Sequence, residues 1–108
     1  MSERANIRWA QTAADALRRI GSQTVRQKLY AKVEDLLRHE RPESIGKPLR
    51  DELQGYYRIT YSRYRILYRV ARAATVPIVE VALVGIRKEG DKRDIYQVAY
   101  RLRRQGRI

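Results

Sequence analysis

The side chains of this chain that could do chemistry are mainly arginines, and five of them lie within residues 56–72. They are interleaved with tyrosine, isoleucine and other uncharged residues, and the segment contains no acidic residue. The five are Arg58, Arg63, Arg65, Arg69 and Arg72. A guanidinium group stays charged at any working pH and can pair two phosphate oxygens at once. A surface that gathers these side chains would therefore suit a polyanion.

The spacing of these arginines predicts a β-hairpin over residues 56–70 with one apolar face and one cationic face. Two runs alternate between apolar and polar side chains, and they meet at a polar break, Ser62-Arg63. The apolar positions are Tyr57, Ile59, Tyr61, Tyr64, Ile66, Tyr68 and Val70. The opposite positions are Arg58, Thr60, Arg65 and Arg69.

Length and charge limit the classes of protein to be considered. With 108 residues the chain is expected to form a single domain over residues 1–108. Its net charge is +12, and residues 56–108 supply +9 of it from 13 basic and 4 acidic residues. The positive field therefore belongs to the half that contains the hairpin. Nucleic acid is the leading partner class, ahead of an anionic membrane or an acidic protein.

Other chemistries are excluded by composition. The chain has no cysteine, which excludes disulfides, thiolate catalysis and cysteine-ligated zinc, and its single histidine, His39, cannot build a metal site alone. We therefore expect no metal and no cofactor. There is no apolar run long enough for a membrane span and no signal-peptide pattern, so a soluble cytoplasmic protein is expected, with no membrane partner.

The first half of the chain predicts a strand followed by two helices. Residues 6–10 alternate as a short strand, and Thr12 is an N-cap candidate for a helix that ends at Gly21. A longer helix is expected from Ser22 or Gln23 to His39, where apolar residues recur at helical spacing. Residues 42–55, which are rich in proline and glycine, are expected to form a loop.

After the hairpin, residues 71–75 are expected to be a connector, residues 76–86 a central strand, and residues 91–104 a helix. The order is then β-α-α-β-β-β-α, an α+β arrangement. A helical hairpin would pack on one face of a small, mostly antiparallel sheet, and a C-terminal helix would follow. The arginines would lie on the other face.

These features together resemble the RelE/ParE superfamily of bacterial toxins from type II toxin–antitoxin pairs. The resemblance covers essentially the whole chain. Its strongest pieces are Tyr64-Arg65-Ile66-Leu67-Tyr68, Val84-Gly85-Ile86-Arg87 and Asp94-Ile95-Tyr96, with the loop at residues 46–55 in support. The resemblance implies a RelE-like fold.

The resemblance also implies two alternative functions. RelE-like toxins are ribosome-dependent endoribonucleases that cut mRNA and inhibit translation, and this branch is favoured. ParE-like toxins inhibit DNA gyrase without nuclease activity. A degenerate toxin that only binds RNA or its partner is a third possibility. In each case the partner implied is a small antitoxin with an acidic or amphipathic segment, while mRNA and ribosomal RNA are further partners of the nuclease.

By position within this family, three residues take catalytic roles. Arg65 would hold the scissile phosphate, Arg87 would stabilise transition-state charge, and Tyr96 would stack on or orient the substrate. Arg58 and Thr60 fall where two strand lysines are expected, and Arg63 and Arg69 would add RNA contacts. The interval from Arg87 to Tyr96 is longer than in the type member, so Tyr100 is an alternative to Tyr96.

The identity of the base is the open point of this chemistry. RNA cleavage without a metal requires a base for the attacking 2′-hydroxyl, an acid for the leaving 5′-oxygen, and stabilisation of a phosphorane. The arginines suit the last task, but Thr60 cannot accept the proton that a lysine there would take. Tyr96 could act as a weak base or proton relay. Such a site should depend on positioning by the ribosome.

Overall fold

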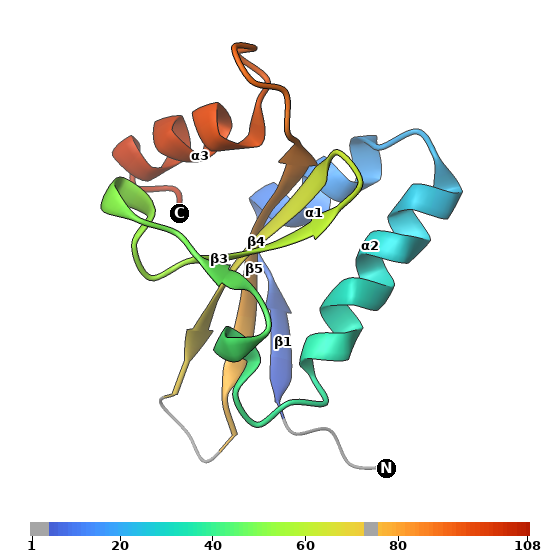
Figure 1. The fold of residues 1–108 in the computed structure, drawn as a ribbon, viewed down its shortest axis with the longest axis vertical. Coiled ribbons are helices and arrows are strands. Elements are labelled where there is room, and N and C mark those ends of the chain that lie inside the picture. Colours follow the sequence, from blue (N-terminus) through green and yellow to red (C-terminus); the bar gives the residue numbers. More distant parts are fainter. Residues whose placement is uncertain (1–4, 73–75) are drawn as a thin grey trace.

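A five-stranded sheet forms the centre of the computed structural model, which describes residues 5–72 and 76–108 (Figure 1). The strand order is β1-β5-β4-β3-β2. The strands are β1 (Asn6–Trp9), β2 (Lys47–Pro48), β3 (Tyr57–Tyr61), β4 (Tyr64–Ala71) and β5 (Ile78–Ile86). Only β1 and β5 pair in parallel; the other pairs are antiparallel, so the predicted α+β fold and mostly antiparallel sheet are confirmed.

Within the described ranges three helices accompany the sheet: α1 (Gln11–Arg19), α2 (Gln23–Leu36) and α3 (Ile95–Arg104). Two short 3₁₀ turns, Pro42–Ser44 and Asp51–Leu53, lie in the segment before β3. Among the described residues, no helix is both long and apolar enough to cross a bilayer. The expected connector at residues 71–75 lies partly outside the described residues, because residues 73–75 are not among them.

The predicted hairpin is confirmed as β3 and β4. Tyr61 and Tyr64 are the last paired residues, and Ser62 adopts a positive φ of 54° in the turn between them. The register places Thr60 opposite Arg65 and Arg58 opposite Leu67. Residues that face each other across two strands point to the same side of the sheet. Arg58, Thr60 and Arg65 therefore share one face, as the alternation predicted.

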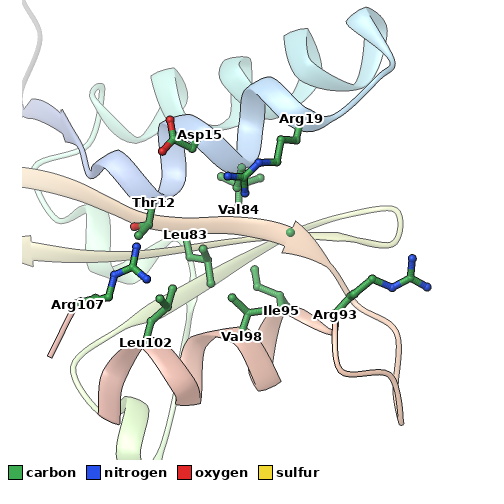
Figure 2. Close-up of a pocket in the computed structure, with 12 residues that line it drawn as sticks. Thr12, Asp15, Arg19, Leu83, Val84, Arg93, Ile95, Val98, Leu102 and Arg107 are labelled. Carbon is green, nitrogen blue, oxygen red and sulfur yellow. The ribbon is translucent and has the colours of Figure 1, made fainter. Parts of the chain in front are cut away.

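That face is not left bare, because the predicted C-terminal helix packs on part of it. Helices α1 and α2 cover the apolar face, with a core made of Ala13, Leu17, Leu29, Val33, Ile66, Val81 and Val84. Helix α3 covers part of the opposite face, where its core partners are Leu53, Leu67 and Leu83. Figure 2 shows α1 and α3 on the two sides of β5. Leu67 lies between Arg65 and Arg69 on β4 and points to the same face of the sheet as Arg65. Helix α3 packs on Leu67 and therefore lies on the face that carries this arginine.

Several element boundaries also differ from the prediction. Thr12 is not the N-cap of α1: its hydroxyl donates to the Ala82 carbonyl at 2.7 Å and ties the helix to β5. Helix α2 begins after Ser22 as predicted but ends at Leu36. From Leu37 onward the backbone amides donate to the carbonyl three residues earlier, which replaces the α-helical pattern, and the Leu37 side chain is buried. Helix α3 begins at Ile95 rather than Asp91, since the intervening residues form turns.

The segment before β3 was expected to be a loop, but it contains the short strand β2 and is anchored by a buried tyrosine. The Tyr68 hydroxyl donates to the Pro42 carbonyl at 2.7 Å and accepts from the Gly46 amide at 2.8 Å. A Cβ at Gly46 would lie 2.6 Å from that hydroxyl and 2.8 Å from the Arg58 carbonyl, so only glycine fits. Through this contact Tyr68 fixes β2 against β3.

Tyr68→Phe is expected to lower the free energy of unfolding by about 1–3 kcal/mol, since it leaves a carbonyl and an amide without their partner in a buried place. The measurement is urea unfolding followed by circular dichroism. Tyr30→Phe is the matched control: Tyr30 is 46% exposed, and its change should stay within about 0.5 kcal/mol. Equal effects of the two substitutions would contradict the anchoring role.

Burial raises the pKa of Tyr68 to about 12, although the Gly46 hydrogen bond acts in the opposite direction. Because the ordinary value is about 10, the folded state favours the neutral hydroxyl, and this contribution to stability is lost as pH rises from about 10 through 12. The stability difference between wild type and Tyr68→Phe should therefore shrink over that range in urea titrations at successive pH values. A difference that stays constant with pH would contradict this account.

Candidate functional site

The candidate site is built where the end of β5 meets the start of α3. Asp94 is the N-cap of α3, and its carboxylate accepts from the Tyr96 amide at 3.2 Å. The other carboxylate oxygen accepts from the Lys88 amide at 2.6 Å and from Arg87 Nη1 at 2.7 Å. This buried carboxylate thereby joins Arg87 and Lys88, which directly follow β5, to the first turn of α3.

Tyr96 lies between two arginines, one from β3 and one from the segment directly after β5. Arg58 of β3 donates from Nη1 to the Tyr96 hydroxyl at 3.2 Å. The guanidinium carbon of Arg87 lies 5.1 Å from the centroid of the Tyr96 ring, a cation–π distance. Three of the predicted site residues, Arg58, Arg87 and Tyr96, are thus gathered into one cluster. We call them the arginine–tyrosine cluster.

Arg65 lies on the same face as the arginine–tyrosine cluster, but its guanidinium is turned to the hairpin. Its Nη1 donates to the carbonyls of Ser62 and Tyr64, each at 2.9 Å. Its Nε is buried and has no hydrogen-bond partner within the part of the chain that the structure describes. Arg65 faces Gly85 across β4 and β5. A Cβ at Gly85 would lie 3.3 Å from Ile95, so this glycine lets α3 start close beside Arg65.

The other predicted RNA-binding residues lie around this arrangement and differ in their contacts. Thr60 is exposed opposite Arg65. Arg63 is exposed in the turn, with its guanidinium 5.6 Å from the Tyr64 ring. Tyr100 lies one helical turn after Tyr96, where Arg104 stacks on it at 5.9 Å. The structure therefore brings Tyr96, rather than Tyr100, into the cluster with Arg58 and Arg87.

Acidic residues from other segments neutralise two of the five arginines within residues 56–72. Arg69 Nε donates to Glu80 at 2.6 Å, and Arg72 pairs with Glu43. Although burial acts to raise the pKa of Glu80, its hydrogen bonds from Arg69 and Arg8 outweigh that effect and lower it. Among the described residues no carboxylate pairs with Arg58 or Arg65. Within residues 56–72, the arginines without a carboxylate partner among the described residues therefore include Arg58, which belongs to the cluster, and Arg65, which shares its face.

Sequence reasoning missed the part played by Asp94. The residue was noted only as part of a motif, although an aspartate directly before the periodic apolar positions Ile95, Val98 and Leu102 is a helix-start signal. The longer interval between Arg87 and Tyr96 is taken up by turns within residues 88–94. No group of three histidine, aspartate or glutamate side chains in the described ranges is arranged to hold a metal ion.

A separate groove runs along β5 between α1 and α3 (Figure 2). Its lining includes Leu83, Val84 and Val98, with Asp15 and Arg19 on the α1 side. None of the arginine–tyrosine cluster lines it. This groove is therefore distinct from the arginine–tyrosine cluster.

Comparison with known proteins places the chain among toxins of toxin–antitoxin systems. Residues 7–89 match the family model described as the ParE toxin of the type II toxin–antitoxin system parDE. A search of curated protein sequences finds no significant match.

Solved structures agree with this family match. A chain of the toxin–antitoxin complex RelBE2 from Mycobacterium tuberculosis is 30% identical with a TM-score of 0.65, and the match covers 77% of this chain and 98% of that one. The isolated RelE toxin of E. coli is 26% identical with a TM-score of 0.61, over 90% and 96%. The YoeB/ParE toxin of Agrobacterium tumefaciens, at 17% identity, a TM-score of 0.64 and coverage of 77% and 99%, shares the fold.

Binding of a short single-stranded RNA should test the electrostatic account of this site. Each phosphate contact releases counterions, so Arg58→Ala and Arg65→Ala should each reduce the slope of log K against log salt by about 0.7. Arg69→Ala is the matched comparison, because Arg69 lies on the same strand as Arg65 but is paired with Glu80, and its slope should change less. Equal changes for all three would contradict the special place of Arg58 and Arg65.

Proposed function

The chain belongs to the RelE/ParE superfamily of toxins from type II toxin–antitoxin systems, and on that premise we propose that it is a ribosome-dependent endonuclease that cuts mRNA and so inhibits translation. The observation that carries this proposal is the contact of Tyr96 with Arg58 and Arg87. Arg65 lies on the same face of the sheet and has no carboxylate partner among the described residues. A cluster with these charges suits a phosphodiester that gains negative charge during cleavage.

In the proposed reaction the 2′-hydroxyl attacks the adjacent phosphorus and gives up its proton to the Tyr96 hydroxyl oxygen, while Tyr96 passes its own hydrogen to the leaving 5′-oxygen. A phosphorane forms, the bond to the 5′-oxygen breaks, and that oxygen takes up a proton. Arg87 and the remaining Nη2 donor of Arg65 hold the non-bridging oxygens, and Arg58 supplies flanking positive charge. The released products are a 2′,3′-cyclic phosphate and a 5′-hydroxyl.

Tyr96 is the proposed group for proton transfer. Its hydroxyl accepts a hydrogen bond from Arg58, so its own hydrogen is directed elsewhere and is free to be donated. Thr60, which takes the place of an expected lysine, is exposed and has no basic group. Because a strong base is missing at that position, the proposal assigns much of the rate to alignment of mRNA by the ribosome.

The proposed partner in the uninhibited cell is a cognate antitoxin. The M. tuberculosis relative was solved as a toxin–antitoxin complex. Residues 56–108 of this chain carry a net charge of +9, which favours an antitoxin segment that is acidic or amphipathic and orders on binding.

Inhibition of DNA gyrase is the second candidate function. Two observations favour it: the matching family model is that of ParE toxins, and Thr60 stands where the nuclease branch would have a proton-accepting lysine. A gyrase inhibitor would arrest growth without cutting transcripts.

Primer extension on an abundant transcript after brief expression in a bacterial host distinguishes these candidates. Wild type should give cuts that disappear when translation is blocked. Arg65→Ala and Tyr96→Phe should reduce cutting by about a hundredfold or more, because they remove a phosphate donor and a proton-transfer group.

The control for this experiment is Arg18→Ala, which removes an exposed arginine on α1 that pairs with Asp15 and should leave the cuts unchanged. Growth arrest with intact transcripts would refute the nuclease proposal, and gyrase-linked DNA breaks would then be measured.

A further inference from the structure

The Arg87 guanidinium must be held in one position if it is to bind a phosphate at a defined point of the site. Arg87 follows the last residue of β5 and leads into the turns of residues 88–94, and its side chain is 32% exposed. Its backbone amide donates to the Arg63 carbonyl at 2.6 Å, which fixes the main chain but not the guanidinium. A long arginine side chain has many rotamers, and ordering it on binding would oppose binding.

The restraint on the guanidinium comes from Asp94. The Asp94 side chain is 3% exposed and meets Arg87 Nη1 at 2.7 Å. One oxygen takes this bond together with the Lys88 amide, and the other takes the Tyr96 amide. A single carboxylate therefore fixes both Arg87 and the helix turn that carries Tyr96.

We infer that Asp94 is a positioning residue that holds the Arg87 guanidinium over the Tyr96 ring and so aligns the two groups for the phosphodiester. This inference rests on the proposed function and names a further residue that it requires. Asp94 touches no substrate; it acts through Arg87 and Tyr96. The Asp94 carboxylate also bridges the two ends of the 88–93 segment, so the position of Arg87 relative to Tyr96 is held by this contact rather than by the segment itself.

The arrangement leaves Arg87 able to bind an anion. Asp94 is buried and accepts a hydrogen bond from Nη1, while the only other carboxylate that pairs with Arg87 among the described residues is Glu89, at 3.7 Å and 91% exposed. A guanidinium carries five N–H donors, so donors remain for a phosphate that arrives from solvent. The exposed glutamate is easily displaced by such a ligand.

The charge state of Asp94 fits this role. Burial acts to raise its pKa, but the hydrogen bonds from Arg87 and the Lys88 amide outweigh burial, and the pKa lies below its usual value. The carboxylate is therefore ionised at neutral pH. The same pair raises the pKa of Arg87.

A purely structural role, as the N-cap of α3, can be separated from positioning by the choice of variant. Asparagine and serine cap helices about as well as aspartate, so Asp94→Asn and Asp94→Ser keep an acceptor for the Tyr96 amide. Asparagine would turn its amide nitrogen to Arg87, a donor against a donor, and serine does not reach it. Asp91→Asn is the matched control: it removes a carboxylate from the same loop, where Asp91 pairs with Arg93 rather than Arg87.

The test combines thermal unfolding, growth arrest on graded expression, and NMR of the arginine guanidinium groups of the purified full chain. We expect Asp94→Asn and Asp94→Ser to stay folded and to lose between about tenfold and a hundredfold of their toxic activity. The Arg87 Nη signals, restrained in wild type, should become averaged in both variants. Asp91→Asn should match wild type in activity and in the Arg87 signals.

Two results would overturn the inference: activity of both Asp94 variants within twofold of Asp91→Asn, or Arg87 signals that are the same in all proteins. Unfolding of both variants would also overturn it, since Asp94 would then serve the fold alone. Failure of the proposed function is read separately, as wild-type growth arrest without translation-dependent cuts. In that case growth arrest and the Arg87 signals still decide the role of Asp94.

Discussion

The pairing of β4 with β5 at the centre of the sheet is the constraint on which the other features depend. Strand alternation sends Ile66 and Val84 to one face and Arg65 and Gly85 to the other. The first face can be buried only by apolar helices, and α1 and α2 supply them. The second face has to accommodate both charge and a core. It does so by alternating Leu67 with arginines, so that α3 packs on the leucine and the guanidinium groups emerge beside the helix.

Acidic residues from outside the hairpin then decide which of its arginines remain available. Glu80 lies across from Arg69 in the sheet, and Glu43 comes from the segment anchored by Tyr68. Like charges close together oppose folding, so these acids offset part of the repulsion within a chain of net charge +12. The pairs are partly exposed, and each adds little stability by itself. Their larger effect is to leave Arg58 and Arg65 without a carboxylate partner among the described residues, while Arg69 and Arg72 are neutralised.

Much of this fold could be predicted from the sequence, because its signals are local. The period-2 alternation of residues 56–70 predicted β3 and β4 and the face on which Arg58, Thr60 and Arg65 lie. Contacts between distant segments could not be predicted in this way. No local pattern indicates that Glu80 neutralises Arg69, that Arg65 bends toward the Ser62 carbonyl, or that Thr12 serves β5 instead of capping α1. The helix-start signal at Asp94 was present, but its bond to Arg87 depends on tertiary structure.

The same dependence on tertiary structure bears on how a site without a lysine at position 60 could cleave RNA. A clamp of guanidinium groups stabilises the phosphorane wherever the substrate comes from, but proton transfer by a tyrosine is slow unless the attacking and leaving oxygens are aligned. Alignment is what a bound template supplies, and free RNA lacks it. A toxin with strong phosphate binding and weak proton transfer would therefore be selective for mRNA held by the ribosome. If the proposed nuclease function holds, Thr60 would limit cleavage of free RNA, while Arg65 and Arg87 would supply the affinity that the aligned substrate needs.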